Sequence, residues 1–199
     1  MDSISGKAVV LGALRAIGRL HKESREGKRL TFERHVAPVY RMIEAAHKDY
    51  VDGFLATKKA IKSSTAPSEV IDFLHDVRRG ALMVRGQALV KIEQMLDEDT
   101  HGGRGLPVGW KSTKDFYEVA HEYFYGATAP AAVSWYSDYV RFVETSAKYL
   151  PGDCWEQEVF GNDPRSDLTF AIERVLDRIE IKFRAVTQQY LVTQRNLVS

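Results

Sequence analysis

Two Glu-x-x-His elements are the residues whose types and spacing most directly suggest chemistry. Glu44 precedes His47 by three positions, and Glu118 precedes His121 in the same way. On a helix this spacing places both side chains on one face, and di-iron carboxylate bundles bind their metals with two such elements and two further glutamates. The pattern therefore gives a metal centre as a first hypothesis, which requires all of these ligands to point into a bundle.

The facing of the two elements argues against that metal centre. At about 100° per residue, His47 falls within the apolar stripe of its helix and Glu44 lies at the edge of the stripe. His121 lies about 120° from the centre of its own stripe, and Glu118 lies on the opposite side. The first predicted helix has no inward acid, and the third offers only Glu93. We therefore predict no metal and no cofactor, and we expect His47 to be a core histidine with a tyrosine or glutamate partner.

A second candidate is an arginine followed by five residues and a histidine. The pattern occurs three times, as Arg15–His21, Arg29–His35 and Arg41–His47. It resembles the loose arginine-to-histidine spacing of the HEPN ribonucleases, an all-α family in which the two side chains act on an RNA phosphate. The resemblance implies a metal-independent, dimeric ribonuclease in which Arg41 holds the phosphate and His47 moves a proton. On a straight helix, however, positions six apart point about 120° away from each other.

Other catalytic groups are few in the sequence. Cys154 is the single cysteine, so the chain cannot form an intrachain disulfide, and the neighbouring acids would raise the pKa of its thiol. The sequence contains no GxSxG motif and no paired-cysteine metal spacing. A chain without disulfides is assigned by default to the cytoplasm.

The composition fits one medium-sized domain. The 199 residues include 44% hydrophobic and 11% aromatic side chains, which is enough for a substantial core. Lys plus Arg number 28 and Asp plus Glu number 27, so the formal charge of +1 gives no electrostatic reason to expect nucleic acid as a partner. The apolar run from Ala8 to Leu14 is far shorter than the roughly 20 residues of a membrane-spanning helix, so we predict none.

Helical periodicity runs through most of the chain, because apolar residues recur at steps of three and four. The stripes are Val36, Val39, Tyr40, Ile43, Ala46, His47, Tyr50, Phe54 and Ile61 in the second predicted helix; Val70, Leu74, Val77, Ala81, Val84, Ala88, Ile92 and Met95 in the third; Phe116, Ala120, Tyr123 and Ala127 in the fourth; and Leu168, Ile172, Val175, Ile179, Phe183, Val186 and Tyr190 in the last. We predict an all-α fold, an elongated and mostly antiparallel bundle of five or six helices, the longest of about 25 to 30 residues.

Polar residues and prolines mark the predicted helix ends. The segment from Glu23 to Thr31 is predicted as a polar linker with Thr31 as a possible N-cap, and Pro38 predicts that the next helix begins near Ala37 or kinks there. Ser112 is predicted to cap the fourth helical region. The predicted helices are 3–24, 37–62, 67–97, 114–150 with a break at 126–130, and 164–196. The whole of 1–199 is predicted as one domain, with a basic first helix and linker over 1–30 and the main bundle over 31–199.

Three surfaces are candidates for binding: a basic face, an aromatic segment and an acidic loop. Their residues are Arg15, Arg19 and Lys22; Trp135, Tyr136 and Tyr139; and Trp155. Since no catalytic set passes the facing test, we predict a non-enzymatic interaction or scaffold module that binds protein partners and can form a homo-oligomer. Two alternatives stay open, the HEPN-like ribonuclease and a peripheral membrane protein whose basic first helix lies on an anionic lipid surface.

Overall fold

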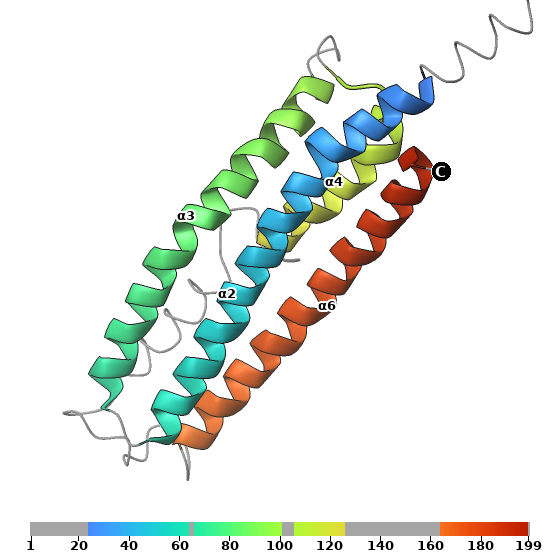
Figure 1. Cartoon of the computed structure of the whole chain (residues 1–199). Helices are drawn as coiled ribbons and strands as arrows, with labels where there is room; N and C mark the ends of the chain where they lie inside the picture. The colour runs from blue at the N-terminus through green and yellow to red at the C-terminus, as the bar shows by residue number, and fades with distance from the viewer. Residues whose placement is uncertain (1–23, 64–65, 101–105, 126–163, 199) are drawn as a thin grey trace, which may run out of the picture.

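The computed structural model describes residues 24–63, 66–100, 106–125 and 164–198, which form helices joined by turns, with no strand among them. Four of these helices are long, and they lie side by side (Figure 1). They are α2 (Ala37–Lys62), α3 (Pro67–Thr100), α4 (Trp110–Tyr125) and α6 (Pro164–Val198). The predicted all-α bundle is confirmed, although α3 and α6, at 34 and 35 residues, are longer than the 25 to 30 residues predicted for the longest helix.

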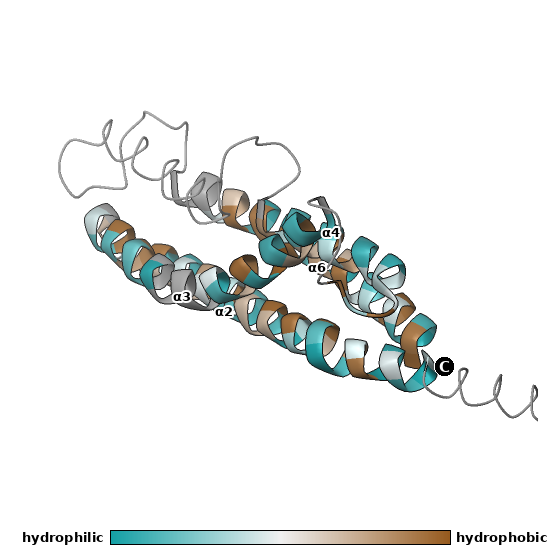
Figure 2. Ribbon diagram, turned by 90° about the horizontal axis from the view of Figure 1, so that it is seen from above, coloured by the Kyte–Doolittle hydropathy of each residue, from teal (hydrophilic) through white to brown (hydrophobic). Residues whose placement is uncertain are grey.

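Each of the four helices packs against two of the others, so that α2, α3, α4 and α6 follow one another around the bundle. The pairs across α2 and α6 show that these helices are antiparallel, because Tyr40 meets Thr187 whereas Lys58 meets Glu173. Figure 2 shows apolar and polar residues alternating along each helix, as helices that bury one face require. The buried apolar residues of all four helices form one core.

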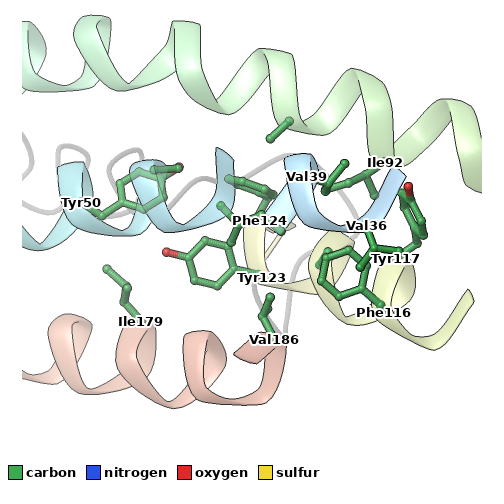
Figure 3. Packing of buried hydrophobic residues seen from close by; sticks show 14 of the residues in the cluster. Val36, Val39, Tyr50, Ile92, Phe116, Tyr117, Tyr123, Phe124, Ile179 and Val186 are labelled. Atoms are coloured by element: carbon green, nitrogen blue, oxygen red, sulfur yellow. The ribbon is translucent and has the colours of Figure 1, made fainter. Parts of the chain in front are cut away.

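The predicted apolar stripes form the core of this bundle. Tyr50 and Phe54 of α2, Ile92 of α3, and Phe116 and Tyr123 of α4 are all fully or almost fully buried. Figure 3 shows Tyr123 reaching from α4 into the space between α2 and α6. The side chains of five predicted core residues lie outside the described set, namely Val77, Ala81, Val84, Ala127 and Leu168.

The predicted linker before α2 is wrong, because residues 24–31 are helical and continue without a break into a π-helical turn, η1 (Phe32–Val36), and then into α2. Thr31 is buried inside this helix, and its hydroxyl oxygen lies 3.0 Å from the carbonyl oxygen of Gly27 and 2.8 Å from that of Val108. Phe32 is also buried and contacts the ring of Tyr190. Tertiary packing therefore outweighs the polar composition of this segment.

The π-helical turn explains how the helix passes Pro38. A proline inside an α-helix clashes with the carbonyl four residues earlier and cannot donate a hydrogen bond. In η1 the Ala37 N–H donates to the carbonyl of Phe32, five residues back, and the wider turn makes room for the ring. The helix consequently runs through the proline and does not begin there.

The start of α4 also differs from the prediction, since the helix begins at Trp110 and not after Ser112. Gly109 reverses the chain with φ of 85°, and the Ser112 N–H donates to the Gly109 carbonyl at 2.8 Å. Trp110 is buried, and its Nε1–H donates to Oδ1 of Asp99 at 2.6 Å. This bond between the end of α3 and the first residue of α4 fixes the helix start.

Candidate functional site

A histidine with polar and aromatic partners lies where α2, α4 and α6 meet. His47 Nδ1 lies 3.2 Å from the hydroxyl of Tyr123, and His47 Nε2 lies 3.5 Å from Oε2 of Glu180. The imidazole stacks on Phe183 with ring centroids 3.8 Å apart. The prediction of a core histidine with a tyrosine or glutamate partner is confirmed, and the structure provides both.

The partners of His47 fix its neutral tautomer. An ionised carboxylate can only accept hydrogen bonds, so Glu180 requires the proton of the neutral ring to sit on Nε2. Nδ1 is then an acceptor, and the Tyr123 hydroxyl donates to it. Glu180 also accepts a hydrogen bond from Nε of Arg184 at 3.0 Å, which holds the carboxylate in place.

The environment of His47 favours this neutral form. Burial lowers the pKa of His47 below its ordinary value of 6.5, although the charge of Glu180 acts in the opposite direction. Protonation of Nδ1 would convert an acceptor into a donor facing the Tyr123 hydroxyl, which is fully buried. The His47 cluster, defined as His47, Tyr123, Glu180 and Phe183, is therefore arranged to hold an uncharged imidazole.

We expect the protein to lose stability as the pH falls through 6.5, because the unfolded chain binds a proton on His47 at a pH where the folded chain does not. The pKa of His47 in the folded chain lies below the unfolded value of 6.5. The contribution of the neutral imidazole to the free energy of unfolding is therefore fully present above pH 6.5 and is lost as the pH falls toward the folded pKa. Urea unfolding at a series of pH values measures it.

His47→Gln is the control for this pH dependence, since an amide has a similar hydrogen-bonding capacity but does not titrate. Hydrogen bonds from Lys114 and Lys58 lower the pKa values of Asp99 and Glu173, respectively. These two carboxylates contribute the same pH dependence of stability to the wild type and to the variant. The wild-type curve should fall more steeply than the variant curve below pH 6.5. Parallel curves would contradict the assignment to His47.

The second Glu-x-x-His element is only partly turned away from the core, because Glu118 is exposed, as predicted, whereas His121 is half-buried. Glu44 of the first element is exposed on α2. His121 instead lies in a groove between α3 and α4 together with Glu93 and Asp97. Within residues 24–63, 66–100, 106–125 and 164–198, no three histidine, cysteine or acidic side chains are placed to hold a metal ion.

The Arg41 and His47 pair lies on two different faces of α2. Arg41 is exposed, whereas the side chain of His47 is only 14% exposed. Both ring nitrogens of His47 already face partners within the fold, so a proton-shuttle role would require the ring to give up one of them. In the Arg29–His35 match, Arg29 lies 3.8 Å from a carboxylate oxygen of Glu33.

The predicted binding surfaces lie outside the described residues. This holds for the basic face, the aromatic segment and the acidic loop, that is, for Arg15, Arg19, Lys22, Trp135, Tyr136, Tyr139 and Trp155. The predicted helix break at 126–130 lies outside them as well.

A different surface emerges on α6, which sequence reasoning missed. Of eight exposed large apolar side chains among the described residues, five belong to this helix. They form the α6 outer surface, defined as Phe170, Ile181, Leu191, Val192 and Val198. Their signal in the sequence is weak, because they fall between charged residues and outside the stronger core stripe of the same helix.

Two of the grooves that the described residues form border α3. One, of about 470 Å³, contains the acidic groups beside His121, and each of Glu93, Asp97 and His121 already takes part in an interaction within the chain. The other, of about 330 Å³, lies between η1, α2, α3 and α4. We call it the basic groove; its lining residues are Arg34, His35, Val39, Lys91, Gln94, Met95 and Tyr117.

Comparisons with protein-family models, with curated proteins and with solved structures found no match to the chain. Among the helices that the structure describes, each is too short or too polar to cross a bilayer.

Proposed function

We propose that the chain is a non-enzymatic helical interaction module and that it self-associates through the α6 outer surface. The observation that carries the proposal is the exposure of Phe170, Ile181 and Val192, at 59%, 64% and 43%. Exposed apolar residues gathered on one helix are typical of protein contact sites, whereas scattered ones need no explanation.

The spacing of these three residues favours a symmetrical contact. Phe170 lies eleven positions before Ile181, and Val192 lies eleven positions after it. Eleven residues make just over three full turns, so the three side chains follow nearly one line along about 33 Å of helix. Two such helices packed antiparallel about a two-fold axis at Ile181 would place Phe170 of each copy against Val192 of the other.

The charges beside this line are compatible with the same two-fold arrangement. Asp177 and Arg184 are exposed on one flank of Ile181, four positions before it and three positions after it. In an antiparallel pair, equivalent flanks face each other, so Asp177 of one copy lies opposite Arg184 of the second copy. Opposite charges at the edge of an apolar seam favour one register and one orientation. The occupant that this surface fits is therefore a second copy of the chain.

Light scattering coupled to size exclusion, from about 1 to about 100 µM full-length protein, tests the proposal. We expect a dimer for the wild type. Ile181→Glu should weaken it at least a hundred-fold, that is by about 2.7 kcal/mol, because two like charges would meet at the two-fold axis. Leu55→Glu is the matched control, since Leu55 is exposed on α2 and not on α6.

Charge reversal tests the antiparallel register. Asp177→Arg and Arg184→Asp should each weaken the dimer, and the double variant should recover most of the loss because it restores opposite charges across the interface. A monomeric wild type at all concentrations would contradict self-association. A dimer that is equally stable with Ile181→Glu and with Leu55→Glu would contradict the use of the α6 outer surface.

A further inference from the structure

The basic groove combines three side chains of the basic residue types, arginine, histidine and lysine, with no acid. Arg34 and His35 come from η1, and Lys91 comes from α3. None of the seven lining residues is an aspartate or glutamate. The chain as a whole has 28 Lys and Arg residues and 27 Asp and Glu residues. The lining of this groove therefore carries a local excess of positive charge.

The charges of this groove are not neutralised within the described parts of the chain. There, Lys58, Lys114 and Lys182 each lie within 4 Å of a carboxylate oxygen of another helix. The side chains of Arg34 and Lys91 form no ion pair or hydrogen bond with any residue of the described ranges. A concave surface concentrates the field of such charges and attracts an anion of matching size.

The floor of the basic groove is apolar and already fixed. Val39 and Tyr117 are almost fully buried, and Met95 packs against the core beside them. The hydroxyl of Tyr117 donates to the carbonyl of His35 at 3.0 Å, so its polar end is occupied. Burial raises the pKa of Tyr117, which keeps this hydroxyl protonated and able to donate. The Tyr117 ring is therefore a fixed part of the base of the groove, and the partly buried Met95 supplies accessible apolar surface there.

We propose that the basic groove binds a small organic phosphate, with the phosphate group between Arg34 and Lys91 and an aromatic or aliphatic body on the floor. Two permanent positive charges match the charge of roughly −1.5 to −2 on a phosphate monoester. Arginine offers a bidentate fork to phosphate oxygens, lysine offers a point charge, and the imidazole of His35 offers a further N–H. The volume of about 330 Å³ suits a small ligand and not a polymer.

This site is separate from the proposed dimer interface. The groove residues come from η1, α2, α3 and α4, and none comes from α6. The loss of either property would therefore leave the other measurable.

Phenyl phosphate is the first probe, because it joins a phosphate to an aromatic ring. Calorimetric titration of the full chain should give saturable binding with one site per chain. Inorganic phosphate, benzoate and phenol each lack one feature of the probe, and all three should bind more weakly. The absence of saturable phenyl phosphate binding would overturn the proposal, and equal binding of benzoate or phenol would overturn the assignment to a phosphate.

Arg34→Glu combined with Lys91→Glu should weaken phenyl phosphate binding at least about ten-fold. Arg41→Glu combined with Lys48→Glu makes the same change in net charge at exposed α2 positions outside the groove, and it should leave the affinity within about two-fold. An equal loss in both double variants would show a general charge effect and overturn the site. If charge reversal reduces the helical circular dichroism, Arg34→Gln with Lys91→Gln takes its place with the same expected direction.

Discussion

Replacement of Tyr123 with alanine should lower the free energy of unfolding by about 3–5 kcal/mol, the cost of removing a large aromatic side chain from a packed core. Tyr123 is fully buried between α4, α2 and α6. Its ring centroid lies 5.1 Å from that of Phe124, 6.2 Å from that of Phe183 and 6.4 Å from that of Tyr50. Alanine would leave a cavity at the junction of three helices, and chemical denaturation followed by circular dichroism measures the loss.

Tyr123→Phe separates the ring from the hydroxyl in this experiment. It should cost only about 1–2 kcal/mol, because the core stays filled while Nδ1 of His47 loses its donor. With His47→Leu as the background, the same change should be almost neutral, since no acceptor is left unsatisfied. Leu55→Ala, at an exposed position, should cost well under 1 kcal/mol. A loss for Tyr123→Ala no larger than for Leu55→Ala would contradict the packing described.

Gly109→Ala should lower the free energy of unfolding by roughly 2–5 kcal/mol, the sum of two effects. The positive φ of 85° places an alanine in the left-handed region at a cost of about 1–2 kcal/mol. A Cβ at this position would also lie 2.7 Å from Cδ2 of Leu197, and overpacking of a buried residue costs about 1–3 kcal/mol. Thermal and urea unfolding of the purified variant measure the sum.

Gly86→Ala is the matched control for Gly109→Ala. Gly86 lies inside α3, and a Cβ there would meet nothing within 4 Å. Alanine is favoured over glycine in a helix interior, so this variant should gain up to about 1 kcal/mol. Equal losses at the two glycines would contradict the backbone conformation described for Gly109.

The periodicity of apolar residues predicted the helices and the core because one repeated physical requirement, burial of one face, acts along each helix. It also placed His47 in the core and Glu118 outside it, since facing depends only on helical geometry. The ends of the helices were predicted less well. Thr31 and Ser112 have the side chains of N-caps, but both lie inside helices that contacts with distant residues extend.

The candidate sites could not be predicted in the same way. The basic groove needs Arg34, Lys91 and Tyr117 from three elements, and no local pattern links positions so far apart. On α6 the line through Ile181 was present in the sequence as an eleven-residue spacing. This line was missed because the strongest apolar stripe of a helix indicates its buried face, and the residues outside that stripe are then expected to face solvent.

The order of the helices around the bundle has a kinetic consequence. The turn between α2 and α3 is short, whereas the α2–α6 contacts join Tyr40 to Thr187, 147 positions apart, and Lys58 to Glu173, 115 positions apart. Closing a loop of this length loses more chain entropy than forming a helical hairpin, and contacts between distant positions slow folding. The His47 cluster requires α2, α4 and α6 together. The neutral histidine is therefore enclosed only after α6 has packed against the distant α2.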